Sequence, residues 1–370
     1  MSSVAPQIDK ASRWAGIRRE FGRAAFAAIV ALVVAFVVVL LTSKAPLDAF
    51  EVLLTAPAAK IRTIGLWIDD AVKLTITGLA FSLVFQARQF SMGVQGQVYV
   101  GALAAAYVAL SPLGATPFGL LFGVVAAMTA GGIWGFLPGY AKARFGANEI
   151  VSSLMLNYVA IELANFLIRT QLRSKPGVLT SPDFPDTALF PQLVDKTRID
   201  LALFVALFAV FLVWFLLYRT SWGLKLRLVG HNPRFAEYSG IKSSTIMVSA
   251  MTASGMLGGL LGSIFVQGQT YGMITVQFEG GLAFEGILVA IVARARPLAV
   301  PFVALAYGYL RQGAQLMNVR TDVPAEVIGV VTAIIILLVS SSYSVNFLKR
   351  LFQRHEGAGL VPKPVEGAAK

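Results

Sequence analysis

The chain contains no cysteine among its 370 residues and only two histidines, His231 and His355. Disulfides and thiolate metal sites are therefore excluded, and two histidines leave almost nothing for a transition-metal centre. Charged residues are also scarce, at 14% against the roughly 25% of a soluble globular domain. Because 56% of the residues are hydrophobic, we expect an all-α integral membrane protein with no metal site and no cofactor of its own.

The motifs of common catalytic machineries are absent as well. The sequence has no G-x-x-x-x-G-K-[ST] phosphate loop, no G-x-G-x-x-G loop and no H-E-x-x-H motif. Two histidines could hardly supply a Ser/His/Asp triad, and the polar residues fall in separate hydrophobic stretches. We therefore expect a non-catalytic protein. If it pumps a solute, the energy comes from an ion gradient or from another polypeptide that docks on its cytoplasmic face.

The apolar residues are grouped into stretches long enough to cross a bilayer. A spanning helix needs roughly 20 mostly apolar residues. About ten stretches are expected to span, the first as a retained helix rather than a signal peptide. These stretches are residues 24–41, 72–90, 93–110, 118–137, 150–168, 201–218, 245–266, 281–293, 297–316 and 324–340. We expect a single transmembrane domain at residues 24–342 between cytoplasmic tails at residues 1–23 and 343–370.

The formal net charge of +12 comes from basic residues scattered among short loops and tails. Without a basic helix or an aromatic platform, this pattern argues against a nucleic-acid partner. It fits membrane topology, because Lys and Arg collect in cytoplasmic loops, and it places both termini in the cytoplasm. Segment 169–200 is the exception, with five basic residues on the expected outer side. Its prolines and aspartates predict an ordered external loop.

Several hydrophobic stretches contain polar or glycine-rich segments. Residues 93–101 read GVQGQVYVG and place Gln95 and Gln97 among glycines. Glycine weakens a helix by about 1 kcal/mol, and broken backbone at membrane depth survives only where protein or water satisfies it. This segment is either a bent helix whose glutamines line a solute path or a tight turn at the interface.

A second polar segment begins at Asn148. This residue is placed to cap the helix that follows, and Glu149 lies near the positive end of its dipole. Further along, Asn157 and Glu162 continue a series of polar positions, which we expect to face the bundle interior. For Asn157 the choice is between a solute path and ordinary hydrogen bonding between helices. Glu162 is expected near the outer interface.

The third segment, residues 277–286, reads QFEGGLAFEG. A broken helix here could present Phe284 and the carboxylate of Glu285 toward a cavity. The alternative is an external loop with two solvated acids. Elsewhere, glycines repeat at every fourth position in residues 131–139 and at 255 and 259, which predicts close helix packing without chemistry.

The polar segment 219–243 lies between two strongly apolar stretches. It is basic, and its pattern is partly helical. On a membrane protein, such a loop is best explained as a docking surface for a cytoplasmic partner.

Four runs of sequence resemble a known family. They are TGLAFSLVFQARQFSMGVQGQ at residues 77–97, LPGYAKARFGANEIVSSLMLNYVA at 137–160, LRLVGHNPRFAEYSGI at 226–241 and FEGILVAIVARARPLAVPFVALAYGYLRQGA at 284–314. They resemble permease subunits of bacterial ATP-binding cassette importers, in the branched-chain amino acid and simple sugar permease superfamily. Within it, the likeness is greatest to the larger permease of nucleoside importers.

The resemblance implies a type II importer fold of about ten transmembrane helices in the bacterial inner (plasma) membrane. It implies a second, non-identical permease, an ATP-binding cassette ATPase that binds ATP, and a periplasmic or lipid-anchored solute-binding protein. Segment 219–243 would hold the coupling helix that contacts the ATPase. The residues at its centre would be Arg227, Gly230, Asn232, Pro233, Glu237, Tyr238 and Gly240.

The chain departs from the family pattern at two places. Relatives usually have F-N-I-G-A-E-G-Q where residues 90–97 read F-S-M-G-V-Q-G-Q, and G-F-D-G where residues 283–286 read A-F-E-G. An amide at Gln95 makes a proton or cation role there doubtful. We therefore expect a small neutral polar solute, a nucleoside or nucleobase first and a simple sugar second. The alternative is an ion-coupled secondary transporter that works without an ATPase.

Overall fold

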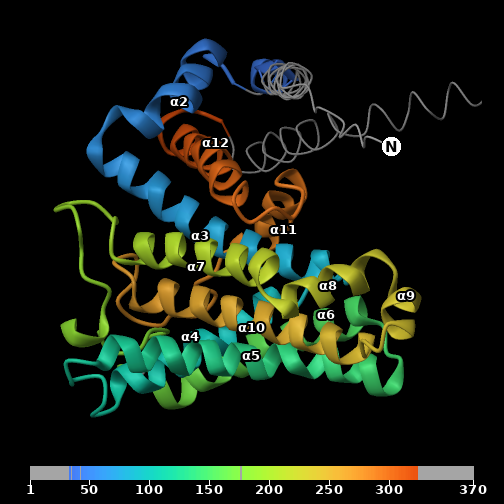
Figure 1. The fold of residues 1–370 in the computed structure, drawn as a ribbon. Helices are drawn as coiled ribbons and strands as arrows, with labels where there is room; N and C mark the ends of the chain where they lie inside the picture. The colour runs from blue at the N-terminus through green and yellow to red at the C-terminus, as the bar shows by residue number, and fades with distance from the viewer. Residues whose placement is uncertain (1–32, 35, 42, 176, 324–370) are drawn as a thin grey trace, which may run out of the picture. The chain divides into compact units, whose positions relative to one another are not determined.

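The computed structural model describes residues 33–34, 36–41, 43–175 and 177–323. Every regular element in these ranges is helical, and β-structure is limited to two isolated bridges. The helices are α2 (Pro46–Ala59), α3 (Ile61–Gln86), α4 (Val94–Leu110), α5 (Gly119–Phe145), α6 (Glu149–Leu167), α7 (Ala202–Arg219), α8 (Ser221–His231), α9 (Pro233–Tyr238), α10 (Ser243–Gln267), α11 (Leu282–Val292) and α12 (Val300–Arg320), with a π-turn at Ile168–Leu172 and a 3-10 turn at Asp186–Ala188 (Figure 1).

The predicted tails 1–23 and 343–370 and the predicted span 324–340 lie outside the described residues, as does most of the span 24–41. Residues Phe50–Thr321 form one compact unit, which holds every candidate site residue. In the described part of the other unit, the Asp322 carboxylate accepts bonds from Ser43 Oγ at 2.6 Å and from the Lys44 N–H at 2.8 Å. These bonds lower the pKa of Asp322.

Four described helical segments are long and apolar enough to cross a membrane, namely Gly119–Phe145, Glu149–Leu172, Ala202–Arg219 and Ser243–Gln267. Two others, α4 and α11, are apolar but have only 17 and 11 residues. The expected all-helical membrane protein is therefore confirmed. The count of ten spans and the placement of both termini stay predictions.

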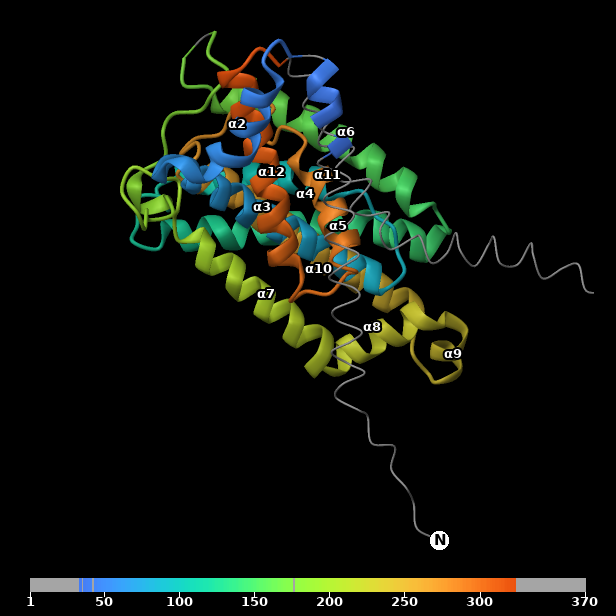
Figure 2. The same cartoon turned by 90° about the horizontal axis from the view of Figure 1, so that it is seen from above.

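The core is built on helices α4, α5 and α10, which pack side by side (Figure 1). Glycines on the facing surfaces bring the backbones together: a Cβ on Gly259 would lie 2.0 Å from the Ala127 carbonyl oxygen, and one on Gly131 would lie 2.4 Å from that of Gly255. The close packing predicted from the glycine spacing is confirmed. Helix α3 crosses this group and also contacts α7, α11 and α12, whereas α6 and α7 lie toward the edge (Figure 2).

Two helix boundaries differ from the hydropathy prediction. Helix α3 begins at Ile61 rather than at residue 72, so Asp69 and Asp70 lie inside it. Hydropathy counts a carboxylate as unfavourable whether or not the fold pairs it, so it placed the start too late. Helix α5 continues through Pro138 to Phe145 and ends at Gly146, whose φ of 67° suits glycine.

The segment after α6 is ordered, as the sequence predicted. Its backbone pairs with the segment after α10: the N–H groups of Ser181, Phe184 and Phe190 donate to the carbonyls of Ile274, Gly272 and Gln267, each at 2.9 Å. The two segments therefore cover the same end of α10. Which side of the membrane this end faces stays a prediction.

Candidate functional site

The helical path is interrupted between α3 and α4, at residues 87–93. The sequence predicted a bend or a turn within residues 93–101, but α4 is continuous from Val94 onward. The glycines there serve close packing instead of bending. A Cβ on Gly96 would lie 2.8 Å from Asn157 Oδ1, and a Cβ on Gly101 would lie 2.5 Å from Gly259 Cα.

Asn157 holds the beginning of α4. Its Oδ1 accepts from the Gly96 N–H at 2.8 Å, and its Nδ2 donates to the Met92 carbonyl at 2.7 Å. One turn earlier on α6, Ser153 Oγ accepts from the Met92 N–H at 3.0 Å. The first turn of a helix has N–H groups without intrahelical partners. Helix α6 therefore supplies the cap that α4 lacks locally.

Gln97 lies deep between α4, α5 and α10, with 2% of its surface exposed. Its Oε1 is buried without a hydrogen-bond partner among the described residues. Gly135 and Gly258 leave the space for this side chain, since a Cβ on either would approach it within 3.1 and 2.7 Å. An unpaired buried acceptor is costly, so this position suits a donor from a bound molecule or a water.

Gln95 connects the beginning of α4 to the beginning of α11. Its Nε2 donates to Glu279 at 3.0 Å. The Glu279 carboxylate also accepts from the N–H groups of Gly281, at 3.0 Å, and Ala283. Glu279 is 3% exposed and therefore acts as a buried cap on a helix of only 11 residues. Residues 277–281 form turns and α11 begins at Leu282, so a helix begins within the predicted segment instead of being broken there. The interpretation of Glu279 as a solvated acid is wrong.

Glu285, in the first turn of α11, pairs with α12 instead of water. Its carboxylate lies 2.8 Å from Arg311 Nε, and Arg311 Nη1 lies 2.8 Å from the Asp70 carboxylate on α3. One guanidinium thus serves two carboxylates from two other helices. Phe284 beside it is half-buried. The solvated interpretation of Glu285 is therefore also wrong.

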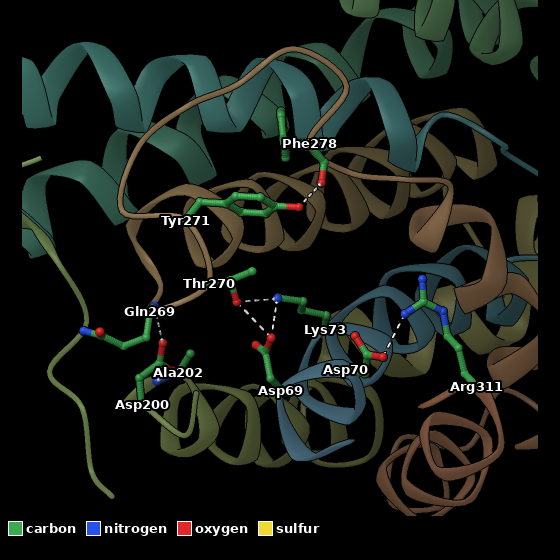
Figure 3. A network of polar contacts seen from close by, with 10 residues as sticks. All are labelled: Asp69, Asp70, Lys73, Asp200, Ala202, Gln269, Thr270, Tyr271, Phe278 and Arg311. Atoms are coloured by element: carbon green, nitrogen blue, oxygen red, sulfur yellow. Dashed lines mark hydrogen bonds and ion pairs between the residues drawn. The ribbon is translucent and has the colours of Figure 1, made fainter. Parts of the chain in front are cut away.

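A second charged network lies nearby on α3 (Figure 3). Lys73 Nζ is 2.7 Å from the Asp69 carboxylate and donates to Thr270 Oγ1 at 3.0 Å, and Thr270 Oγ1 donates to Asp69 at 2.9 Å. Lys73 is 3% exposed, and its ammonium also lies 4.9 Å from the centre of the Phe265 ring. The network ties the inner part of α3 to the segment that follows α10.

The same segment is held at two further points (Figure 3). Asp200 accepts from the Ala202 N–H at 3.0 Å and from the Gln269 N–H at 3.1 Å. Burial raises the pKa of Asp200, although these two backbone donors act in the opposite direction. Tyr271 donates to the Phe278 carbonyl at 3.0 Å. Residues 268–278 are therefore bonded to α3 and to the beginning of α7, and one further bond joins two residues within the segment.

The polar segment after α7 forms two helices, α8 and α9. Asn232 caps α9 by accepting from the Phe235 N–H at 3.1 Å, and Pro233 occupies the first turn. The hydroxyphenyl group of Tyr238 is 93% exposed, and Phe235 is exposed as well. Two exposed aromatic side chains thus lie on one six-residue helix.

The remaining predicted residues of this segment have separate roles in its shape. Gly240 turns the chain with φ 77°, and Glu237 is exposed. Arg227 lies over the Tyr218 ring at 5.0 Å. Gly230 packs on the end of α3, because a Cβ there would lie 2.0 Å from the Gln86 carbonyl oxygen. Gly230 therefore links this segment to the interruption before α4.

At the other end of α6, Asn148 Oδ1 accepts from the N–H groups of Ile150 and Val151 at 2.9 and 3.3 Å. Glu149 forms an ion pair with Lys142 of α5. The structure thus has the cap that the sequence predicted. Lys142 also donates a hydrogen bond to Gln89. Helix α5 therefore contacts the interruption between α3 and α4, as α6 and α8 do.

Four interior charged residues were not predicted from the sequence, namely Asp69, Asp70, Lys73 and Arg311. Two signals could have found them. Asp69 and Lys73 stand at i and i+4, which places them on one face of a helix. Arg311 lies within a predicted span, where an ionisable side chain marks an interior position by default. No group of three or more metal-ligating side chains occurs in the described part of the chain.

Comparison with known proteins identifies a family whose sequence model matches most of this chain. The model described as "Branched-chain amino acid transport system / permease component" matches residues 64–340. The guanosine ABC transporter permease protein NupP of Bacillus subtilis is 31% identical over 326 residues, which cover 87% of this chain and 93% of the relative.

Two further relatives extend the comparison. The nucleoside ABC transporter permease protein NupB of Lactococcus lactis is 25% identical over 82% of this chain and 86% of its own. The glucose ABC transporter permease protein TsgB13 of Haloferax volcanii is 27% identical over 89% of each chain. No solved structure matches the chain at a significant level.

Proposed function

The chain belongs to the permease family of branched-chain amino acid transport systems, and from this premise we propose that it is a transmembrane permease subunit of an ATP-binding cassette importer. It forms half of a pathway through the bacterial inner membrane, in a type II fold of about ten helices with both termini cytoplasmic. A second, non-identical permease completes the pathway. A separate ATPase binds and hydrolyses ATP, so this subunit needs no cofactor, and a solute-binding protein delivers the solute.

The proposed solute is a nucleoside or a nucleobase, with a simple sugar second. The names of NupP and NupB support the first choice, and that of TsgB13 supports the second. Within the chain, the interior polar groups at the two helix interruptions include the amides Gln95 and Gln97, which suit a neutral solute. We propose that Gln95, Gln97, Phe284 and Glu285 line the pathway, and that Asn157 positions α4 beside them.

This proposal rests mainly on the structure of helices α8 and α9. They present exposed aromatic side chains at Phe235 and Tyr238 for a partner and contact the end of α3 through Gly230. A partner that moves α9 therefore also moves the junction between α3 and α4. Because the chain has no phosphate loop, this mechanical link is how ATP hydrolysis would reach the pathway.

A charge reversal on α9 tests this coupling. In Glu237→Arg, the fold is expected to stay intact because the side chain is exposed. ATP-driven uptake should fall at least about tenfold, the effect of losing roughly 1.4 kcal/mol at a docking surface. The rates of solute uptake and of ATP hydrolysis are measured for the complex in vesicles. The exposed Lys225 on α8 provides the control, Lys225→Glu, which should transport normally; equal loss in both variants would count against α9.

A second prediction concerns Asn157. In Asn157→Leu, the Gly96 N–H and the Met92 carbonyl lose their partners, which costs about 1–3 kcal/mol for each buried group. We expect impaired uptake by a complex that still assembles. Asn165→Leu is the matched control on the same helix, because Asn165 is buried and its Oδ1 has no partner among the described residues. Normal uptake in Asn157→Leu would show that Asn157 is not required for transport.

Ion-coupled secondary transport remains the second candidate, and the interior charges favour it. Asp70, Arg311 and Glu285 meet beside the short helix α11, and ionisable residues near a broken helix are typical of ion-coupled carriers. Purification of the tagged chain from its native membrane in mild detergent, followed by mass spectrometry, separates the two. An importer yields a P-loop ATPase, a second permease and a binding protein, whereas a secondary transporter yields the chain alone.

A further inference from the structure

An ionisable side chain lies near the middle of the helical segment that contains α6, on the face that this chain leaves exposed. The spanning segment Glu149–Leu172 has 24 residues, so Glu162 lies ~20 Å from its beginning and ~15 Å from its end at 1.5 Å per residue. The sequence predicted Glu162 near the interface and facing the interior. The π-turn prolongs the helical segment to Leu172 and leaves Glu162 near its middle, and its depth in the membrane stays a prediction. The side chain is exposed, so the expected interior-facing position is wrong.

Glu162 has no partner in the described part of the chain. It makes neither an ion pair nor a hydrogen bond there, although it is surrounded by exposed apolar neighbours. The exposed residues of this face are Val151, Met155, Tyr158, Val159, Leu163 and Phe166. A carboxylate at mid-membrane costs about 2.5–3.5 kcal/mol on insertion scales when it faces lipid. A lipid-facing position is therefore a poor explanation for Glu162.

The exposed faces of two other spans, α7 and α5, provide a comparison within the same chain. The exposed side chains of α7 before Arg219 are aromatic or aliphatic, from Phe204 to Tyr218. The same holds for α5 between Leu121 and Tyr140, apart from one threonine. No charged side chain is exposed in these stretches. The face of α6 differs from these surfaces by one exposed carboxylate.

Two aromatic side chains flank the carboxylate. Tyr158, Glu162 and Phe166 stand at i, i+4 and i+8, which places them in one row along the helix. Tyr158 and Phe166 are 65% and 60% exposed. An ionised carboxylate only accepts hydrogen bonds and therefore selects donors. Aromatic rings above and below it suit a flat or ring-shaped apolar surface. Together they fit a molecule with a ring and hydroxyl groups.

We propose that Tyr158, Glu162 and Phe166 line the aqueous solute path and contact the solute, with the Glu162 carboxylate accepting hydrogen bonds from sugar hydroxyls. The inference rests on the proposed importer function. It names a feature that nucleosides and simple sugars share and that a free nucleobase lacks. It also identifies the α6 face as the surface across which the second permease completes the path.

The absence of native cysteine allows a direct test in the assembled complex. The variants Glu162→Cys and Phe211→Cys each introduce one thiol into this chain at mid-span, the second on the apolar face of α7. A charged, membrane-impermeant maleimide is added to vesicles that hold the complete complex, and labelling of this chain is followed on a gel. We expect the thiol at position 162 to react at least about tenfold faster, since thiolates form in water and not in lipid. Saturating guanosine should slow its reaction.

Equal, slow labelling at both positions would overturn the proposal, because position 162 would then face lipid or a dry subunit contact. Fast labelling that guanosine does not slow, in vesicles whose wild-type complex takes up guanosine, would overturn the solute contact. Failure of the importer function itself appears separately, as absence of guanosine and glucose uptake by the wild-type complex. The labelling contrast between positions 162 and 211 does not depend on that result.

A second variant tests the hydroxyl contact. Glu162→Gln keeps the size of the side chain but removes its charge. The ratio of guanosine uptake to 2′,3′-dideoxyguanosine uptake should fall by about tenfold relative to wild type, as expected for weakening a charge-assisted hydrogen bond. The solute-binding protein is the same in both vesicles and cancels from the comparison. An unchanged ratio would contradict the assignment.

Discussion

Replacing Lys73 with methionine is expected to destabilise the folded protein by about 3–5 kcal/mol, the usual cost of breaking a buried ion pair from one side. Methionine fills most of the space, but Asp69 keeps its charge and, among the described residues, retains the Thr270 hydroxyl as its side-chain hydrogen-bond donor. Both charged side chains are buried, at 3% and 8% exposure. A large fall in the thermal unfolding midpoint of the complex in mild detergent would show the effect.

The double variant Lys73→Met with Asp69→Asn separates charge from packing. Removing both charges should recover most of the lost stability, because no uncompensated carboxylate remains. Lys225→Met serves as the control, since Lys225 is exposed on α8. A double variant as unstable as Lys73→Met alone would contradict the ion pair as the cause.

Gly259→Ala is the second change with a large expected effect. Its Cβ would lie 2.0 Å from the Ala127 carbonyl oxygen, so α5 and α10 would have to separate. Overpacking of this kind typically costs about 1–3 kcal/mol, and here the obstructing atom belongs to backbone that cannot rotate away. Reduced amounts of folded protein in the membrane, and a lower unfolding midpoint, are the expected results.

Gly139→Ala is the matched control at the same pair of helices. The nearest atoms to its Cβ would be Met251 Cβ, Met251 Sδ and Val248 Cα, each at 3.3 Å, so a shift of a few tenths of an ångström suffices. We expect little change in stability. Equal losses in Gly139→Ala and Gly259→Ala would mean that helix propensity, rather than backbone contact, decides the outcome.

The sequence predicted the parts of this fold that depend on local pattern. Apolar length indicated the four candidate spans among the described residues, Asn148 indicated the beginning of α6, and glycine spacing indicated the packing of α5 on α10. The family resemblance drawn from four sequence runs is also confirmed, since the family model covers residues 64–340. Each of these signals is contained in a short window, so no knowledge of the tertiary structure was required.

Sequence signals could have marked the interior charges as buried, but not the ion pairs that join different helices. Arg311 is far in sequence from Asp70 and near Glu285 only in space, so nothing local shows that one guanidinium serves two helices. Hydropathy began α3 too late because it counts Asp69 and Asp70 as unfavourable whether or not the fold pairs them. Likewise, a bend was expected within residues 93–101, but the interruption lies at residues 87–93. Helix α4 begins directly after it, where Asn157 of α6 accepts a hydrogen bond from the Gly96 N–H.

The faces of α6 show a third limit. Its polar residues were all expected to face the interior, yet Asn157 is buried against α4 while Tyr158 and Glu162 are exposed. Neighbouring positions on a helix point about 100° apart, so one series of polar residues can serve two surfaces. Only the packing of α6 on α4 and α5 decides which surface each residue occupies.

The central claim is that this chain moves its solute with energy from a separate ATPase. Its most direct test is guanosine accumulation by vesicles that hold the purified complex, with ATP supplied on the ATPase side and no ion gradient. We predict accumulation that requires ATP hydrolysis and stops when the phosphate loop of the partner ATPase is mutated. Accumulation by the chain alone, driven by a proton or sodium gradient and indifferent to ATP, would contradict the account.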